Sequence, residues 1–391
     1  KKKKQKRKRR KKPQQKIKRS VGRHEPFLSK ASESLLPYTP GEQAAGAKFI
    51  KLNTNECPYP PSPKVAEAIL AGYEVNSSKI MPLELANLRL YSDPEERVLI
   101  EAIADHYGVG TNQVIAGNGS DEILGFAFRA FCDQNAPLQF ADLTYGFYPA
   151  LCGLYGIPFK VVPLEEDFTL NIEPYKNCGN NVIIANPNAP TGMNLPLSAI
   201  EEVAASNPDR VVMVDEAYVD FGGESCVSLL PKYENLVIIQ TFPIPQLSRA
   251  RVGFAIANPE LIADMNRIKY SFNPYNVNRL SILAGAAAMR DWDYTKECTG
   301  RICKTREKTT EALRALGFTV LDSKTNFIFA KSGDMPGKVY FDGLREAGIL
   351  VRRWDSERIK DYVRISIGSE EEMERLLRRR RSWWKRREVQ L

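Results

Sequence analysis

Apolar positions in this chain fall into two kinds of stretch that alternate over most of its length. Short unbroken apolar runs, such as 211–214 and 236–239, are typical of strands buried on both faces of a parallel sheet. Between such runs lie segments with apolar residues at helical spacing, for example from Leu88 to Gly108. Strands and helices that alternate in this way predict an α/β fold built on an open, mostly parallel sheet flanked by helices.

The pattern gives approximate bounds for each element. We predict a strand, a glycine turn and a helix over 114–131, a strand that opens into a loop over 181–192, and strands at 138–140, 159–164, 211–214, 236–242 and 252–257. Helices are predicted at 62–70, 88–108, 145–155, from about 197, and at 259–270, 275–290 and 294–315. Residues 318–377 are richer in strands and predict a smaller α+β unit that ends in a helix at 370–377.

Composition adds little to this picture except at the two ends. The net charge is +9, but residues 1–19 hold 14 Lys and Arg, and residues 378–391 hold seven with one Glu. Removing the +14 and +6 of these segments leaves −11 for residues 20–377, so charge gives no general nucleic-acid role to the body of the chain. A nucleic-acid module formed by the basic ends is kept as an alternative.

These observations divide the chain into five parts. We expect a basic tail at 1–19 that is disordered or foreign to the protein, an N-terminal arm with part of the small domain at 20–75, a large domain at 76–290, a C-terminal small domain at 291–377, and a second doubtful basic tail at 378–391.

The cysteines and histidines exclude several classes of site. Seven cysteines without CxxC spacing, beside only two histidines, argue against a Cys/His zinc site, and we expect no metal. Free thiols favour a reducing, cytoplasmic location. No apolar run reaches the roughly 20 residues that span a bilayer, so we expect no membrane association.

Candidate chemistry gathers where predicted strands end. Asp215 and Tyr218 follow the apolar run at 211–214, and the turn at 117–121 precedes a helix whose free N–H groups could bind an anion. Because ligands of such sheets bind at the carboxyl ends of strands, these features should converge. A phosphate-binding turn, a carboxylate for a pyridinium nitrogen and two phenols, with Tyr145 as the second, together suggest pyridoxal phosphate. A capping Asp and an ordinary glycine turn are the alternatives.

A series of motifs then identifies a family resemblance. The motifs, in order, are KLNTNECPYPPSP (51–63), RLYSDPE (89–95), AGNGSDE (116–122), LTYGFYP (143–149), ANPNAPTG (185–192), VVMVDEAYVDF (211–221), RVGFAIANPELI (251–262), PYNVN (274–278) and YVRISIG (362–368). With these motifs the chain resembles the fold-type I pyridoxal-phosphate aminotransferases, and among them the histidinol-phosphate aminotransferases. The resemblance implies a large domain with a seven-stranded sheet and a homodimer.

The resemblance also implies roles for individual residues. Asp215 would pair with the ring nitrogen of pyridoxal 5'-phosphate and Tyr218 with its ring oxygen, while Tyr145 stacks on the ring. The implied phosphate ligands are Ser120, Asp121 and Arg251, with Tyr91 reaching in from the partner subunit. Asn188 and Thr241 belong to the implied cofactor site as well. For the substrate, Arg364 would bind the α-carboxylate and Arg352 the phosphate, since a guanidinium suits either anion.

The sequence departs from the family at its most important position. The resemblance places the Schiff-base lysine at Ile244, but the loop reads Pro243-Ile244-Pro245, is one residue short, and no lysine lies between Lys232 and Lys269. Without an amine there is no base for the Cα proton. Three explanations stay open: a local error in the sequence at these positions, a protein that binds the cofactor but has lost catalysis, or a functional substitution. A milder departure is Ala189 where the family has Asn.

The sequence therefore predicts transamination between glutamate and imidazole-acetol phosphate in histidine biosynthesis, on small-molecule substrates. The alternatives are a threonine-phosphate decarboxylase or aromatic aminotransferase of the same fold, or a non-catalytic protein of that fold.

Overall fold

The computed structural model describes residues 29, 32, 35–43, 49–70, 72–75, 79–82, 87–242 and 251–388. Contacts divide the chain into residues 1–35 and 36–391, and the features below belong to the second unit. The basic tail at 1–19 and the predicted lysine position, Ile244, lie outside the described residues.

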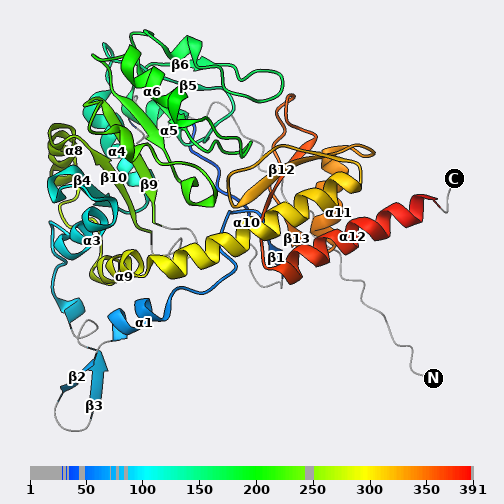
Figure 1. Ribbon diagram of the computed structural model, residues 1–391, viewed down its shortest axis with the longest axis horizontal. Helices are drawn as coiled ribbons and strands as arrows, with labels where there is room; N and C mark the ends of the chain where they lie inside the picture. The colour runs from blue at the N-terminus through cyan, green and yellow to red at the C-terminus, as the bar shows by residue number, and fades with distance from the viewer. Residues whose placement is uncertain are drawn as a thin grey trace, which may run out of the picture. The chain divides into compact units, whose positions relative to one another are not determined.

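A seven-stranded sheet organises the larger part of this unit (Figure 1). Its order is β4 (Val114–Gly117), β10 (Gly253–Ala257), β9 (Leu236–Thr241), β8 (Val212–Asp215), β7 (Asn181–Ala185), β5 (Leu138–Ala141) and β6 (Phe159–Val162). The strands from β9 to β6 pair in parallel, and β10 alone runs antiparallel to its neighbours β9 and β4. The predicted mostly parallel sheet is therefore confirmed.

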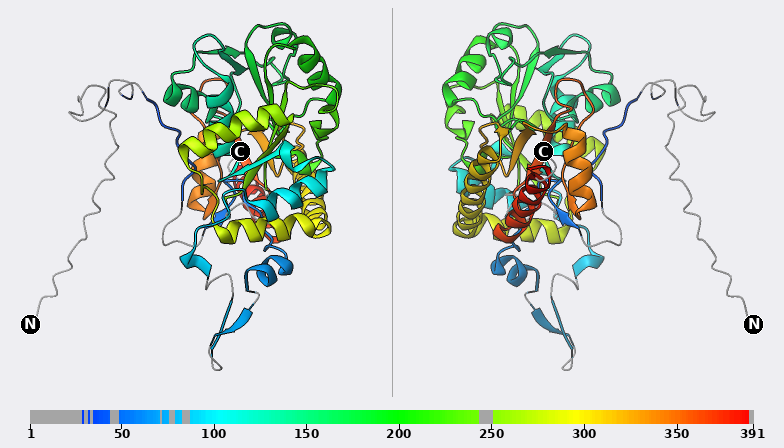
Figure 2. Two further views of the ribbon diagram at one scale, coloured as in Figure 1. Left: turned by 90° about the vertical axis from the view of Figure 1, so that its left-hand side faces the viewer. Right: turned by 90° about the vertical axis from the view of Figure 1, so that its right-hand side faces the viewer.

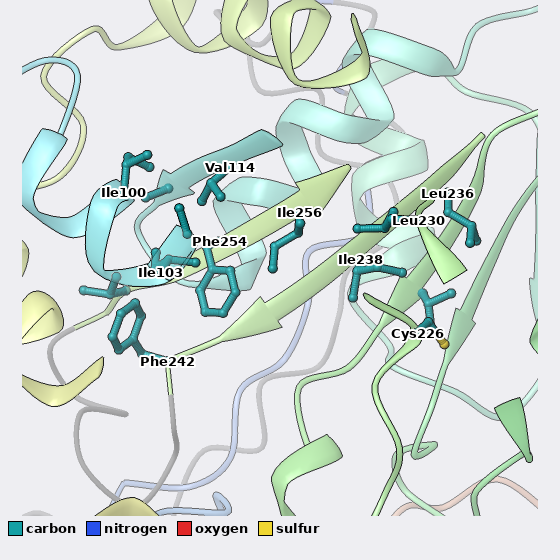
Figure 3. Packing of buried hydrophobic residues seen from close by; sticks show 14 of the residues in the cluster. Ile100, Ile103, Val114, Cys226, Leu230, Leu236, Ile238, Phe242, Phe254 and Ile256 are labelled. Carbon is teal, nitrogen blue, oxygen red and sulfur yellow. The ribbon is translucent and has the colours of Figure 1, made fainter. Parts of the chain in front are cut away.

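Two layers of helices bury the two faces of the sheet. Side chains of a strand alternate between faces, so Val212 and Val214 pack on one side and Met213 on the other. The first face is covered by α3 (Arg97–Tyr107), α6 (Leu197–Ser206) and α9 (Arg279–Arg290), and the second by α4 (Ser120–Phe131), α5 (Tyr148–Tyr155) and α8 (Pro259–Phe272). Figure 3 shows part of the first face, where Phe254 of the sheet lies near Ile103 of α3 and Ile238 lies near Leu230.

The C-terminal part has its own apolar core around a second sheet. Helix α10 (Trp292–Ala315) follows α9 and packs against β11 and α12 (Figures 1 and 2). The remaining elements are β11 (Phe318–Val320), β12 (Phe327–Ser332) and β14 (Tyr362–Ser366) in antiparallel order, α11 (Gly337–Glu346), α12 (Glu370–Glu388), and β13 (Ile349–Leu350), which pairs in parallel with β1 (Ile50–Lys51). The division into domains stays a prediction.

Short elements complete the description. They are α1 (Pro63–Leu70), the antiparallel pair β2 (Gly72–Val75) and β3 (Lys79–Pro82), and the 3-10 turns η2 (Asn87–Arg89), η3 (Thr111–Gln113), η4 (Glu173–Tyr175), η5 (Val219–Phe221) and η6 (Cys226–Leu229). The predicted cap of α1 is present, because the Ser62 hydroxyl accepts a hydrogen bond from the Lys64 amide at 3.1 Å.

Two helix boundaries differ from the sequence prediction by nine residues or more, and α5 and α9 begin three and four residues later than predicted. Helix α3 begins at Arg97 rather than at 88, and the Asp93 carboxylate accepts a hydrogen bond from the Arg97 amide at 3.2 Å. Helix α12 continues to Glu388 rather than ending at 377. Its extension is stabilised where Arg380, fully buried, pairs with Asp334 at 2.6 Å.

Two searches of the described residues bear on broad function. None of the described helices is both long and apolar enough to cross a membrane. The same residues contain no group of three or more His, Cys, Asp or Glu side chains arranged to hold a metal ion.

One buried ion pair ties the start of α3 to α8. The Lys269 ammonium lies 2.5 Å from the Glu96 carboxylate, with side chains 2% and 1% exposed. Burial raises the pKa of Glu96, and the lysine charge opposes that rise. The carboxylate depends on this one cation because both groups have left water.

We expect the loss of one partner of this pair to be costly. Lys269→Met should lower the free energy of unfolding by roughly 3–5 kcal/mol, since it leaves a buried carboxylate unpaired. Adding Glu96→Gln should recover much of that loss. Urea denaturation measures the free energy of unfolding of the single and the double variant. Equal free energies for these two variants would contradict the role of the Lys269–Glu96 pair.

Candidate active site

Polar side chains from several strand ends and from the C-terminal part line one cavity of about 360 Å³. Its floor comes from β7, β8 and β9, which end at Ala185, Asp215 and Thr241. Predicted residues that line it are Ser120, Asp121, Tyr145, Asp215, Tyr218, Thr241, Arg251, Arg352 and Arg364. The expected convergence of features at the carboxyl ends of the strands is thus observed.

Asp215 is a buried carboxylate at the end of β8. Its side chain is 4% exposed and accepts hydrogen bonds from the Tyr148 hydroxyl at 2.7 Å and from the Ala217 amide at 3.2 Å. Burial raises the pKa of Asp215 from 3.8 to about 6, while these two hydrogen bonds hold it lower than burial alone would. No described cation contacts the carboxylate, so it is suited to a cationic group of a ligand.

The glycine turn forms the opposite side of the cavity. Gly119 has a φ of +77°, and α4 begins at Ser120 directly after it, with its positive dipole end toward the cavity. The Arg251 guanidinium lies 2.8 Å from the Asp121 carboxylate beside this turn. A helix N-terminus and a nearby arginine together suit a phosphate group.

Gly253 explains how the turn and strand β10 come so close. A Cβ atom at Gly253 would lie 2.3 Å from the Gly119 carbonyl carbon and 2.3 Å from the Ser120 nitrogen. Only glycine leaves this space, so the close approach depends on it. Asn276 also stabilises the turn. Its side-chain amide donates to Glu122 at 2.7 Å, and its backbone carbonyl accepts from the Asn118 side chain at 2.6 Å.

Two tyrosines stand on the walls between floor and turn. The Tyr145 hydroxyl donates to Asp121 at 2.8 Å, and its ring meets Tyr38 edge-on with centroids 5.8 Å apart. The Tyr218 hydroxyl accepts a hydrogen bond from the Asn55 side chain at 2.8 Å. Burial raises the pKa of both tyrosines, so both stay protonated near neutral pH.

Two arginines and a tryptophan close the cavity from the C-terminal part. The Trp354 ring lies 5.5 Å from the Arg352 guanidinium and 5.4 Å from that of Arg364. Burial lowers the pKa of Arg364, and its Nε atom has no hydrogen-bond partner among the described residues. Arg352 donates to the carbonyls of Thr39 and Pro40 at 2.8 and 2.9 Å. An unpaired buried guanidinium nitrogen indicates that an anion belongs beside it.

One predicted site residue lies away from the cavity, and the predicted roles of two others are not tested by this single chain. The Asn188 amide does not line the cavity; it donates to Leu143 and Thr191 and accepts from Thr144, so it joins its own loop to the segment after β5. Tyr91 is 80% exposed and stacks on Tyr275 with centroids 4.7 Å apart. Ile244 lies outside the described residues, and none of the described residues that line the cavity is a lysine.

The sequence analysis missed several residues that shape this site. Tyr148, Asn55, Gly253, Trp354 and Tyr38 were not predicted to act there. Tyr148, Gly253 and Asn55 lie inside quoted motifs, and the positions of the first two beside Tyr145 and Arg251 were the available signal. Trp354 lies in none of these motifs, and both it and Asn55 reach the site through tertiary packing.

The hydrogen-bonding and charged groups of these residues fit the phosphate, ring nitrogen and ring oxygen of pyridoxal 5'-phosphate. The glycine turn with Arg251 would hold the phosphate, Asp215 would pair with the ring nitrogen, and Tyr218 would donate to the ring oxygen. The unpaired Arg364 nitrogen leaves one cation for a substrate anion.

The raised pKa of Asp215 has a consequence for stability. The folded state binds this proton more tightly than the unfolded chain, so the cofactor-free protein should lose stability as pH rises from about 4 through about 6. The difference between 3.8 and about 6 corresponds to roughly 3 kcal/mol. Asp215→Asn should remove this pH dependence, as measured by urea denaturation between pH 4 and pH 7.

A second variant checks the cause of this effect. Tyr148→Phe removes a hydrogen bond that lowers the pKa of Asp215, so the loss of stability should extend to higher pH. A pH profile identical to that of the unaltered chain would contradict the role of Tyr148.

Comparisons with known proteins agree with this geometry. The chain matches the aminotransferase class I and II family over residues 47–379. It is 45% identical over 350 residues to a histidinol-phosphate aminotransferase of Brachyspira hyodysenteriae, which covers 89% of this chain and 96% of the relative. It is also 45% identical over 346 residues to one of Pseudomonas putida, with 88% and 96% covered.

The fold agrees as well. The structure of a histidinol-phosphate aminotransferase from Sinorhizobium meliloti in complex with pyridoxal-5'-phosphate gives a TM-score of 0.79 at 24% identity, and the match covers 91% of this chain and 98% of that one. The resemblance seen in the motifs is therefore confirmed. The chain belongs to the histidinol-phosphate aminotransferase family, within the aminotransferases of class I and II.

Proposed function

We propose that this protein binds pyridoxal 5'-phosphate and transfers an amino group between histidinol phosphate and 2-oxoglutarate, as the names of its relatives indicate. The observation that carries the proposal is the pairing, in one cavity, of the buried Asp215 carboxylate with the glycine turn beside Arg251. When bound, the cofactor supplies an electron sink for the carbanion at the substrate's α-carbon.

Each side chain has a task in this reaction. Asp215 keeps the ring nitrogen protonated, because a buried carboxylate without a described cation favours a positive partner. Tyr145 and Tyr218 orient the ring, and Arg364 with Arg352 binds the anionic end of either substrate. The arm residue Tyr38 covers the cavity beside Tyr145 and helps to exclude water.

The proton at the α-carbon needs a base, and here position 244 is decisive. The segment 243–250 reads PIPQLSRA and holds no lysine, and the described lining supplies none. This observation favours a second candidate function, in which the protein binds the cofactor and the amino compound without efficient turnover.

Covalent trapping separates the two candidates. With isoleucine at 244, borohydride should leave the peptide over 236–256 unmodified, whereas Ile244→Lys should give that peptide the mass of a reduced cofactor adduct. Turnover of histidinol phosphate should rise by about 100-fold or more in that variant, the range that a positioned base supplies.

The outcomes of this experiment are distinct. An adduct in the unaltered chain would mean that a lysine occupies the segment, and would remove the non-catalytic candidate. Turnover of threonine phosphate or phenylalanine, with none of histidinol phosphate, would contradict the proposed substrate. Absence of cofactor binding by both chains would remove the proposal itself.

We further propose that the protein works as a homodimer in the cytoplasm. Exposed apolar side chains in segments 88–91 and 272–275, called the patch below, support the dimer: Leu88, Leu90, Tyr91, Phe272 and Tyr275 are between 45% and 80% exposed, and Tyr91 stacks on Tyr275. Tyr91 would then reach the phosphate site of the partner subunit, as the family resemblance implies. No other class of macromolecular partner is proposed.

We expect charge in this patch to disrupt the dimer. The double variant Leu90→Asp/Phe272→Asp should sediment as a monomer, because each aspartate would have to leave water at the interface. Val339→Asp is the matched control, since Val339 is also exposed, at 56%, but lies on α11 outside the patch. A monomeric unaltered chain, or a control variant that also dissociates, would contradict the assignment.

A further inference from the structure

A buried polar cluster lies directly behind the floor of the cavity, on the opposite face of the sheet. In the parallel pairing of β8 and β9, Asp215 is opposite Ile239, which places the next residues, Glu216 and Gln240, side by side. Because side chains alternate, these two point away from the face that carries Asp215 and Thr241. Glu216 and Gln240 therefore lie on the first face of the sheet, whose apolar side chains, including Ile238 and Phe254, are shown in Figure 3.

The cluster is fully hydrogen-bonded and almost free of solvent. The Gln240 amide donates to Glu216 Oε2 at 2.8 Å, and Gln240 Oε1 accepts from the Tyr107 hydroxyl at 2.5 Å. Glu216 also accepts from the Ser225 hydroxyl at 2.7 Å and the Cys226 amide at 2.6 Å. Glu216 and Gln240 are 1% and 3% exposed, so each lost bond would leave a costly unsatisfied group.

The position of this cluster relates it to the site. The last backbone bond between the two strands runs from the Glu216 amide to the Ile239 carbonyl at 2.7 Å, and the Glu216–Gln240 contact continues the pairing beyond it. One partner directly follows Asp215 and the other directly precedes Thr241. Tyr107 anchors Gln240 to α3, and Ser225 with Cys226 anchors Glu216 to the start of η6.

We propose that Glu216 and Gln240 are positioning residues, which fix the Asp215 carboxylate relative to Thr241. Neither touches the cavity. They hold the two strand ends at the spacing that lets Asp215 meet the ring nitrogen while the phosphate rests on the glycine turn. We call the Glu216–Gln240 contact the clamp. Its effect on the cofactor rests on the proposed cofactor binding, whereas its effect on the position of Asp215 does not.

The first test removes the clamp without adding charge. Gln240→Met keeps the side-chain length but abolishes both hydrogen bonds, and the affinity of the full chain for pyridoxal 5'-phosphate should fall at least tenfold in a fluorescence titration. Gln139→Met is the matched control, because Gln139 is a buried amide on β5 of the same sheet, two strands away from β8, and donates to the Pro174 carbonyl. Its affinity should stay within twofold of the unaltered chain.

A rescue experiment separates positioning from general stability. Gln240→Glu places two carboxylates in contact and should weaken binding at least as much as Gln240→Met. Adding Glu216→Gln restores one donor and one acceptor across the contact, so the swapped pair should return to within threefold of the original affinity. A Gln240→Met affinity within twofold of the unaltered chain, an equal loss in Gln139→Met, or a swapped pair that is as stable as the original yet does not regain affinity would each overturn the proposal.

The cofactor-free chain gives an independent readout. If the unaltered chain does not bind the cofactor, the proposed function fails, and the clamp is then judged by the coupling free energy between Asp215 and Tyr148. A double-mutant cycle of Asp215→Asn and Tyr148→Phe measures it by urea denaturation. The coupling should fall by at least half in the Gln240→Met background and persist in the Gln139→Met background; equal coupling in both overturns the positioning role.

Discussion

The site depends on one constraint, the burial of a negative charge at the end of a central strand. The Asp215 carboxylate is 4% exposed and is held by a phenol and an amide rather than by a described cation. Burial alone would favour its neutral form, and the two hydrogen bonds only partly oppose that. A bound pyridinium would offset the cost of burying the ionised carboxylate. Asp215 can therefore lower the stability of the cofactor-free protein and still be needed when the cofactor is bound.

The surrounding structure serves to hold this carboxylate opposite an anion site. Gly253 lets β10 approach the turn at Gly119 closely enough for Arg251 to stand beside α4. On the far face of the sheet, the Glu216–Gln240 contact ties the ends of β8 and β9 together. Floor and turn are thus fixed by backbone approach on one side and by a buried hydrogen-bond cluster on the other.

Position 244 decides whether the protein has a base for the proton at the substrate's α-carbon. The cavity brings together a buried carboxylate, aromatic walls and three arginines, yet the sequence has isoleucine where the resemblance places the base. The groups that would hold the cofactor come from elements other than segment 243–250, so the proposed binding and the proposed turnover can be tested separately.

The sequence by itself determined the order of strands and helices, because unbroken apolar runs and helical spacing reflect burial directly. It also determined the family, and most of the site residues that it predicted do line the cavity, since these sit at strand ends and in long motifs. It misplaced the start of α3, where the Asp93 carboxylate accepts the Arg97 amide, and the end of α12, where the buried Arg380 pairs with Asp334.

Only the tertiary structure decided which side chains turn toward the cavity. Asn188 forms two of its hydrogen bonds with residues 143–144, beyond the end of β5, while Asn55 and Trp354 reach the site from segments far away in the chain. Tyr148 becomes the partner of Asp215 because α5 packs on the face of the sheet that carries it. Local patterns report the burial and period of a residue, whereas its partners depend on which elements pack together, and that information is not local.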